Sequence, residues 1–106
     1  DYIHVMDLAE GHVSTLQYLN NSEHKIVNFN LGTGIGTSIL ELIDTFERVN
    51  NISISKNFAA RRIGDSCTVI ADNSLALSNL NWSPKRDLET MCFDGWKWQK
   101  SNPEGY

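Results

Sequence analysis

The sequence predicts a small mixed α/β fold with few strands, and three observations lead to this prediction. Residues 25–31 alternate between polar and apolar side chains, as a strand does, with Val27, Phe29 and Leu31 on one face. Residues 39–49 repeat apolar side chains at the 3.6-residue period of an amphipathic helix. The chain has 106 residues, 41% of them apolar, which suffices for one domain or for part of a larger one.

The N-terminal third is predicted to form a short strand, a helix and a longer strand. Residues 2–5 are expected to be extended, because the segment is short and contains β-branched residues. Asp7 is the expected N-cap of a helix that reaches about Asn20, and a turn over 20–23 leads to the strand at 25–31. The apolar face of this helix consists of residues at helical intervals: Leu8, His12, Leu16 and Leu19.

The middle of the chain carries the strongest helix signal. Ser38 and Glu41 form a capping-box pattern, in which each side chain bonds a backbone N–H of the other residue's turn. The helix they open is expected to end at Asn50 and Asn51. Its apolar stripe consists of Ile39, Leu42, Ile43, Phe46 and Val49. Residues 52–55 alternate again and predict a second strand, with Phe58 as its furthest end.

The C-terminal part is predicted to hold two further helices. Residues 59–65 have neither period and read as a loop, and residues 67–70 as a brief extended piece. A short helix is expected over 73–80, followed by a connector at 82–86. Asp87 then caps a last helix, which ends before residue 102. The apolar stripe of that helix consists of Leu88, Met91, Cys92 and Trp96.

Composition argues against several classes of partner. The net charge is −4 and no basic run is present, whereas nucleic acid requires clustered Lys and Arg. No apolar window approaches the roughly 20 residues of a membrane span. The first residues do not have the pattern of a signal peptide. The sequence begins within a segment that is expected to be structured, and its first residue is not methionine, which suggests a chain cut from a longer one.

Neither a metal site nor a catalytic constellation is expected. Cys67 and Cys92 are predicted to be buried free thiols, in accord with a reducing cytoplasm. The histidines share no ligand spacing, and His4 and His12 are interpreted as a strand residue and a helix-face residue. No Ser/His/Asp order, Cys–His pair or pair of carboxylates stands in a convincing place.

The glycine-rich stretch NLGTGIGTS, residues 30–38, lies between a predicted strand and a predicted helix, where dinucleotides often bind. Gly32 and Gly34 fit the first two places of the G-x-G-x-x-G fingerprint, but Thr37 occupies the third. The second predicted strand lacks the acid that would hold a ribose, and no Gly-Lys-Ser/Thr follows. We interpret the stretch as a tight turn with positive φ angles, and the helix start remains free to face a ligand.

Arg61 and Arg62 form a cluster of positive charge in an otherwise acidic chain. The two-pronged donor geometry of arginine suits phosphate, and a loop lets the side chain reach a cleft. Asp65 is placed to accept hydrogen bonds from sugar hydroxyls or to orient an arginine. The residues alone leave two readings open: an anion site, or a solvated surface pair.

Five blocks in order and in register resemble the C-terminal part of the UDP-glucose 4-epimerases, which are extended short-chain dehydrogenases/reductases. They are DYIHVMDLAEGH at residues 1–12, NLGTGIGTS at 30–38, RRIGD at 61–65, LNW at 80–82 and WKWQKSNPEGY at 96–106. The resemblance covers essentially the whole chain. It implies that residues 1–106 are most of the smaller, substrate-binding domain, and that the NAD-binding Rossmann domain is absent from this chain.

The resemblance also implies which residues contact substrate. Tyr2 lies in a segment that lines the nucleotide site, and the arginine that precedes this segment in the family is absent here. Arg62 corresponds to the arginine that grips the diphosphate, Asp65 to an acid near the ribose, and Ile39 to an apolar residue bordering the site. Departures from the family occur at Ala60, at Ile63 and at Val69, where relatives can carry a tyrosine.

In that family, NAD oxidises and then reduces C4 of the hexose of UDP-glucose or UDP-galactose, assisted by a Tyr-x-x-x-Lys pair. None of those catalytic groups lies in this chain, so the resemblance implies a fragment that is inactive alone, binds no NAD itself and holds UDP-hexose weakly. It implies a cytoplasmic enzyme whose homodimer forms through the missing domain. The alternatives are another nucleotide-sugar enzyme (a uronate epimerase, decarboxylase or dehydratase) and a non-catalytic α/β interaction module.

Overall fold

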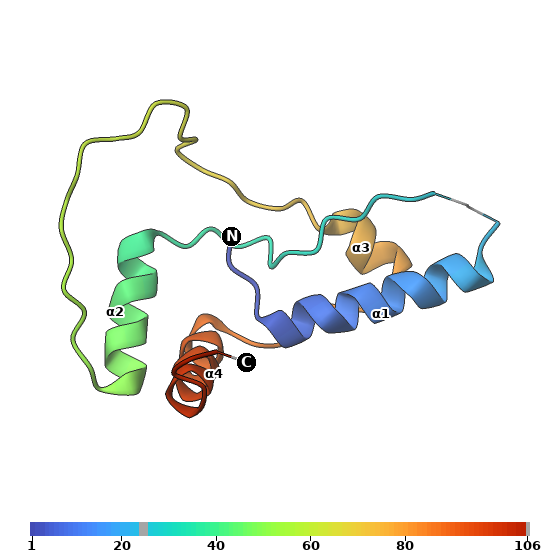
Figure 1. Cartoon of the computed structure of the whole chain (residues 1–106). Helices are drawn as coiled ribbons and strands as arrows, with labels where there is room; N and C mark the ends of the chain where they lie inside the picture. Colours follow the sequence, from blue (N-terminus) through green and yellow to red (C-terminus); the bar gives the residue numbers. More distant parts are fainter. Residues whose placement is uncertain (24–25, 106) are drawn as a thin grey trace.

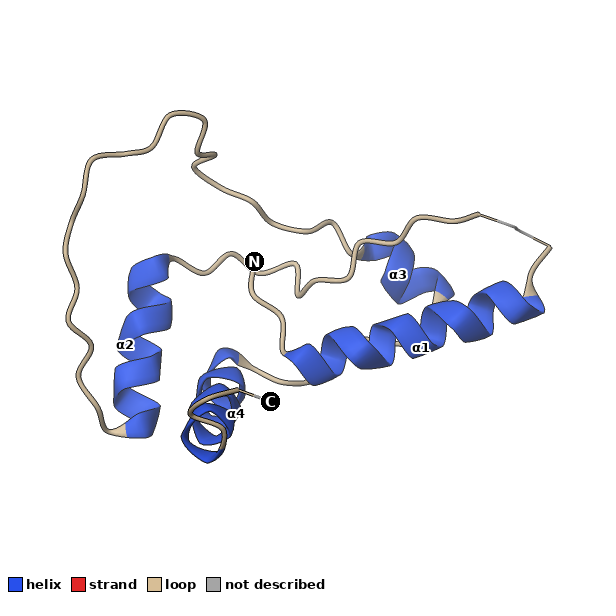
Figure 2. Ribbon diagram, in the orientation of Figure 1, coloured by secondary structure: helices blue, strands red, loops and turns tan. Residues whose placement is uncertain are grey.

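The computed structural model describes residues 1–23 and 26–105, and these residues form four helices joined by long irregular segments (Figures 1 and 2). The helices are α1 (Val5–Asn21), α2 (Ile39–Asn50), α3 (Ser74–Asn79) and α4 (Leu88–Ser101). No strand occurs among the described residues. Within the same residues, no helix combines the length and the apolar character needed to cross a membrane.

The prediction of a mixed α/β fold is therefore wrong for the described part of the chain. The segments predicted as strands, 26–31 and 52–58, are irregular, and Lys25 lies outside the described residues. The predicted alternation is nevertheless present, because Val27, Phe29 and Leu31 are half-buried while residues 26, 28 and 30 are exposed. A strand needs a second strand to bond its N–H and C=O groups, and these segments find none in the described residues.

The start of α1 also differs from the prediction. The helix begins at Val5, so residues 2–5 are not a strand and Asp7 is not the cap. His4 is the N-cap instead: its Nδ1 accepts a hydrogen bond from the backbone N–H of Met6 at 3.1 Å. Asp7 lies in the first helical turn and is fully buried.

The other helix starts are confirmed. Ser38 accepts from the N–H of Glu41 at 3.1 Å, and Glu41 accepts from the N–H of Ser38 at 2.6 Å, which completes the predicted capping box of α2. Asp87 caps α4 by accepting from the N–H of Thr90 at 2.8 Å. The C-cap of α2, Asn51, has a left-handed backbone with φ of 52°, a conformation that Asn tolerates better than most residues.

The apolar packing lies in two places. One core joins α1, α3 and the connector after α3; its buried members are Ala76, Leu80 and Trp82, with Ile3, Tyr18, Phe29 and Leu31 packed against them. Gly11 lets α1 approach closely, because a Cβ there would lie 2.8 Å from Leu31 and 3.2 Å from Trp82. The other place is the contact of α2 with α4, where the rings of Phe46 and Trp96 meet edge to face with centroids 5.9 Å apart.

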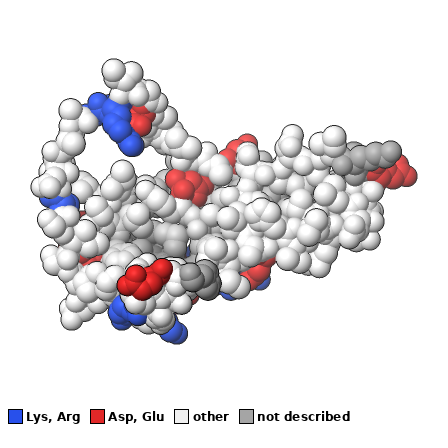
Figure 3. Space-filling view, in the orientation of Figure 1, with Lys and Arg blue, Asp and Glu red and all other residues white. Residues whose placement is uncertain are grey.

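The molecule is extended for its size. Its radius of gyration is 16.8 Å, against about 13 Å for a compact chain of this length. Its accessible surface is 8193 Å², against about 6,000 Å² for a compact protein of this mass. The segment from α2 to α3 projects as an open loop, and the space-filling view leaves an opening between this loop and the rest of the molecule (Figures 1 and 3). Much apolar surface is therefore left uncovered.

Candidate functional site

Tyr2 lies between two cavities near the start of α2. The outer cavity has a volume of about 490 Å³, and the inner cavity has a volume of about 150 Å³. The outer cavity is lined by Asp1, Tyr2, Gly36, Thr37, Ser38, Ser66, Cys67, Thr68, Val69 and Ile70. The inner cavity is lined by Tyr2, His4, Thr33, Ile35, Thr37, Arg86, Asp87, Leu88 and Met91. Tyr2 and Thr37 belong to both and separate one from the other.

The outer cavity is rich in hydroxyl groups. Thr37 and Ser38 supply them from the start of α2, and Ser66 and Thr68 supply them from the facing segment. Hydroxyls both donate and accept hydrogen bonds, and the start of a helix carries a partial positive charge that favours anions. The cavity is chemically suited to a polar ligand with an anionic group and a ring that packs on Tyr2.

The predicted site residues are brought together only in part. Tyr2 lines the outer cavity, Ile39 follows the cavity residue Ser38 directly, and Asp65 directly precedes Ser66. Arg62 does not line this cavity: its side chain is 86% exposed, and its Nε donates to the carboxylate of Asp65 at 3.0 Å. Figure 3 shows the corresponding patch of adjoining positive and negative charge on the projecting loop.

The other arginine of the loop is also engaged locally. Arg61 donates to the carbonyl oxygen of Asp65 at 2.7 Å and to the sulfur of Cys67 at 2.9 Å. Cys67 is exposed, so the prediction of a buried thiol is wrong for it, because the loop that carries it packs against little. Cys92 is buried as predicted, and this burial raises the pKa of its thiol.

The glycine stretch packs against the segment on the other side of the outer cavity. Of its three glycines only Gly34 has a positive φ, at 73°. Gly32 and Gly36 are required for close approach instead: a Cβ on Gly32 would lie 2.5 Å from that of Ala71, and one on Gly36 would lie 2.8 Å from Cδ1 of Ile70. The stretch therefore packs directly on residues 70–71, and the prediction of positive φ angles holds at one position of three.

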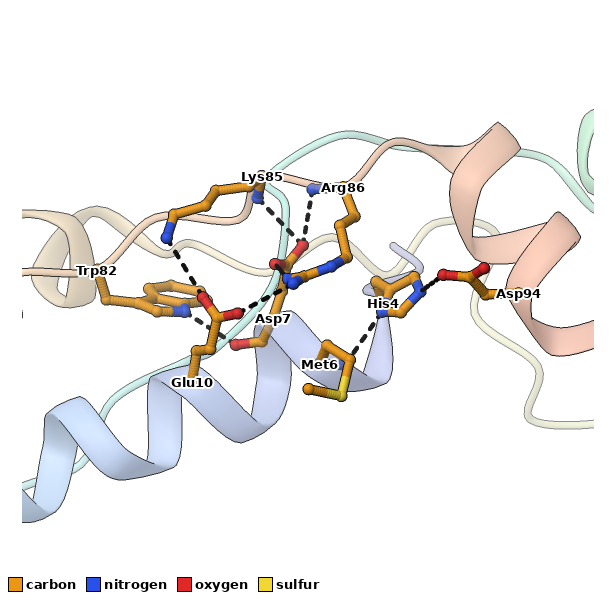
Figure 4. A network of polar contacts seen from close by, with 8 residues as sticks. All are labelled: His4, Met6, Asp7, Glu10, Trp82, Lys85, Arg86 and Asp94. Carbon is orange, nitrogen blue, oxygen red and sulfur yellow. Dashed lines mark hydrogen bonds and ion pairs between the residues drawn. The ribbon is translucent and has the colours of Figure 1, made fainter. Parts of the chain in front are cut away.

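A polar network fixes α1 to the connector before α4 (Figure 4). The carboxylate of Asp7 accepts from the backbone N–H groups of Lys85, at 3.1 Å, and Arg86, at 2.9 Å, and from the Arg86 guanidinium. That guanidinium also donates to Glu10 at 3.1 Å. Burial raises the pKa of Asp7, but the hydrogen bonds from Arg86 and Lys85 outweigh it and hold this pKa below its ordinary value. Arg86 thus lines the inner cavity with its charge already paired.

His4 completes the base of the site. Because its Nδ1 accepts from Met6, the proton of the neutral ring lies on Nε2, which faces the carboxylate of Asp94 at 3.2 Å (Figure 4). His4 is only 4% exposed. As the N-cap of α1, His4 fixes the direction in which the chain enters the helix, and this positions the preceding residues, including Tyr2.

Replacing His4 by Ala is expected to lower the free energy of unfolding by about 1–2 kcal/mol, since loss of an N-cap alone typically costs about 1 kcal/mol. His4→Asn keeps an acceptor at the cap but loses the contact with Asp94, so about half of that loss should be recovered. Urea unfolding followed by circular dichroism measures both variants. Equal losses in both would show that the cap is not the source of the stability.

Among the described residues, no group of three or more His, Cys, Asp or Glu side chains is arranged to hold a metal ion. Apart from Ser38, which the capping box marks, the sequence does not single out the hydroxyl residues of the outer cavity or the carboxylate of Asp1. The partners of Asp1 lie far along the chain, as with Ala71, so no local pattern marks this carboxylate.

No family model matches the chain, but curated relatives match it from end to end. It is 50% identical to UDP-glucose 4-epimerase of Bacillus subtilis and 48% identical to that of Haemophilus influenzae, in each case over 106 residues. It is 44% identical to the Drosophila melanogaster enzyme over 107 residues. Each alignment covers 100% of this chain and 31% of the relative, so the chain spans about 31% of the length of these relatives.

Solved structures give the same result. UDP-glucose 4-epimerase from Bifidobacterium longum, crystallised with NAD⁺ and UDP, has a TM-score of 0.90 and 37% identity, covering 100% of this chain and 31% of that one. The UDP-Glc/GlcNAc 4-epimerase from Campylobacter jejuni has a TM-score of 0.83 and 35% identity, covering 95% of this chain and 30% of that one. Over its whole length, the chain is therefore homologous to the C-terminal part of UDP-glucose 4-epimerases.

Proposed function

We propose that residues 1–106 form the substrate-binding region of a UDP-glucose 4-epimerase, which interconverts UDP-glucose and UDP-galactose in galactose metabolism. The observation that carries the proposal is the outer cavity: Tyr2, the start of α2 and residues 66–70 enclose one hydroxyl-lined hollow. The chain resembles throughout its length an epimerase that was crystallised with UDP. A nucleoside diphosphate has the ring and the anionic group that this hollow suits.

In this proposal the four predicted residues have the roles that the resemblance implies. Tyr2 packs on the nucleoside, and Ile39, 67% exposed at the first position of α2, borders it. Arg62 binds the diphosphate, for which its guanidinium fork is better suited than for the single Nε contact it makes with Asp65. Asp65, released from that contact, accepts from the ribose hydroxyls. The exposed loop carrying both residues turns toward the cavity when the ligand binds.

The residues of this chain hold the nucleotide and leave the sugar to the remainder of the enzyme. NAD, when bound by that remainder, supplies the oxidation and reduction at C4. NAD does not fit the glycine stretch here, because the carboxylate of Asp1 already accepts the backbone N–H groups of Thr33 and Gly34 that a pyrophosphate would need. In this proposal the remainder also forms the homodimer, and the complete enzyme is cytoplasmic.

The test replaces the C-terminal 31% of the Bacillus subtilis enzyme, the part that this chain matches, by residues 1–106. We expect the chimera to interconvert UDP-galactose and UDP-glucose. In it, Arg62→Ala should raise KM for UDP-galactose about 10-fold or more, since a hydrogen bond to a charged group is worth about 1.5–3 kcal/mol. The value of kcat should change little, because this contact is made equally in the ground and transition states. A coupled spectrophotometric assay measures both constants.

The matched control is Arg48→Ala, which removes an arginine of α2 that is paired with Glu89 on α4, away from the outer cavity. It should leave KM unchanged. A correctly folded chimera without epimerase activity, or an Arg62→Ala variant with the KM of the parent, contradicts the proposal.

A further inference from the structure

The carboxylate of Asp1 is the meeting point of two segments that lie far apart in the sequence. Its Oδ1 accepts from the backbone N–H of Thr33 at 3.1 Å and from the Thr33 hydroxyl at 2.6 Å. Its Oδ2 accepts from the backbone N–H of Gly34 at 3.0 Å and from that of Ala71 at 3.1 Å. Each oxygen therefore accepts two hydrogen bonds. Three of the four come from the glycine stretch and the fourth comes from the facing segment.

Further contacts tighten the same junction. The backbone nitrogen of Asp1 donates to the carbonyl oxygen of Val69 at 2.9 Å. Asn73 donates to the carbonyl oxygen of Gly32 at 2.8 Å, and Gly32 itself has no room for a Cβ between Ala71 and the Asp1 carboxylate. The segments at 32–34 and 69–71 are thus joined by side-chain hydrogen bonds where no backbone ladder is formed in the described residues.

Each of these two segments leads directly into residues that line the outer cavity. Residues 36–38, the end of the glycine stretch, form one wall, residues 66–70 form the facing wall, and Tyr2 follows Asp1 directly. From this geometry we infer that Asp1 is a positioning residue: its carboxylate sets the width of the outer cavity and the place of Tyr2 within it. This role rests on the proposed function, since the cavity is taken to hold a nucleoside diphosphate.

A carboxylate is required by the count of donors. Asn at position 1 would offer one oxygen and one NH₂ group, so at least one pair of N–H or hydroxyl donors would face another donor. Glu offers both oxygens but is one methylene longer, so it would widen the junction. Asp1→Asn therefore removes the positioning, whereas Asp1→Glu retains part of it.

The experiment uses both the 106-residue chain and the chimera described above. In the chain, Asp1→Asn should raise the exchange rate of the Thr33, Gly34 and Ala71 amide protons by about 10-fold or more, while amides of the α2–α4 contact are unchanged. In the chimera, Asp1→Asn should lower the affinity for UDP by about 10-fold or more, as measured by calorimetric titration. The value of kcat should stay within about twofold of the parent. Asp1→Glu should recover part of the affinity.

Two further variants separate positioning from folding. Thr33→Val removes only the hydroxyl contact, so it should lower the affinity for UDP less than Asp1→Asn does. It should also leave the melting temperature nearly unchanged. With Tyr2→Ala already in place, Asp1→Asn should cost much less affinity than it does in the parent, because its effect is exerted through Tyr2 and the wall. Asp44→Asn, which makes the same charge change on the exposed face of α2, is the control and should have no effect.

The outcomes for the two proposals differ. If the chimera that carries the unmodified chain does not bind UDP in the calorimetric titration, the proposed function and the role of Asp1 are overturned together. A parent that binds UDP, with an Asp1→Asn variant of equal affinity and equal amide exchange, overturns the role of Asp1 alone. Fully additive effects of Asp1→Asn and Tyr2→Ala also overturn it.

Discussion

Asp7→Asn is expected to lower the free energy of unfolding by about 3 kcal/mol, since removing one partner of a buried ion pair typically costs about 3–5 kcal/mol and Arg86 is partly solvated. Asp7 is fully buried and its carboxylate accepts from the guanidinium of Arg86 and from two backbone N–H groups. Asn can accept on one side only, so its NH₂ group faces either the guanidinium or the backbone donors. Urea unfolding of the 106-residue chain at neutral pH measures the loss.

The control is Glu10→Gln, which makes the same change of charge on a carboxylate that bonds the same arginine but is more exposed. Its effect should be much smaller, because exposed ion pairs contribute little. Equal effects of the two substitutions would contradict the special place of Asp7.

The pH dependence provides a second check. Because the folded pKa of Asp7 is lower than its ordinary value of 3.8, its contribution is complete above that pH and is lost as the pH falls through the folded pKa. The difference in unfolding free energy between the parent and Asp7→Asn should therefore shrink below about pH 4. A difference that stays constant down to pH 2 would contradict the assignment.

Trp82→Ala is expected to lower the free energy of unfolding by about 4 kcal/mol, the usual range for a large core aromatic being about 3–5 kcal/mol. Trp82 is 7% exposed and joins α1, α3 and residues 29–31. Its Nε1 also donates to the carbonyl oxygen of Asp7 at 2.9 Å, so the buried carbonyl loses its indole donor in the variant. Thermal unfolding followed by the far-ultraviolet circular dichroism of the helices measures the change.

Trp82→Phe divides this effect into its parts. The ring fills much of the space but lacks the N–H, so we expect a loss of about 1–2 kcal/mol from the missing indole hydrogen bond and the smaller ring. Phe93→Ala is the matched control for removal of an aromatic ring: Phe93 lies on α4 and is 51% exposed, so its loss should be small. A Trp82→Ala variant no less stable than Phe93→Ala would contradict the assignment of the core.

Where the structure follows the sequence, the signals are local. The capping box of Ser38 and Glu41 and the cap at Asp87 depend on residues three positions apart, and the structure confirms both. Short-range hydrogen bonds of this kind form wherever the chain leads into a helix, whatever lies around it. The apolar faces of α2 and α4 were predictable for the same reason, as they depend only on helical period.

Where the prediction is wrong, the missing information is long-range. The alternation at 26–31 shows which side chains turn inward, but a strand also requires a neighbour in register, which the described residues do not supply. The sequence predicts Asp7 as a cap because acids often precede helices, whereas its partners are Lys85 and Arg86, far along the chain. The sequence predicts His4 as a strand residue, because a histidine N-cap has no distinctive sequence pattern.

The candidate site was predictable only through resemblance. Composition and spacing left the Arg61–Arg62 pair as either an anion site or a surface pair, and the five blocks shared with the epimerases favoured the former. Tyr2 lines the outer cavity, but Arg62 is held by Asp65 at a distance from it, so its role remains a prediction. Asp1 could not be recognised from sequence, because its partners lie 32, 33 and 70 positions further along.

The open segment between α2 and α3 has a consequence for how such chains can vary. Closing a flexible loop costs only about 0.6 kcal/mol more for each doubling of its length. Residues 57–60 are all exposed and precede the Arg62–Asp65 element, so added or deleted residues there displace no packed neighbour. Residues 69–73 are bonded to Asp1, Asn30 and Gly32, so a single inserted residue would shift that register and break several bonds at once. Length differences among homologues should accordingly accumulate before residue 61 and be rare after it.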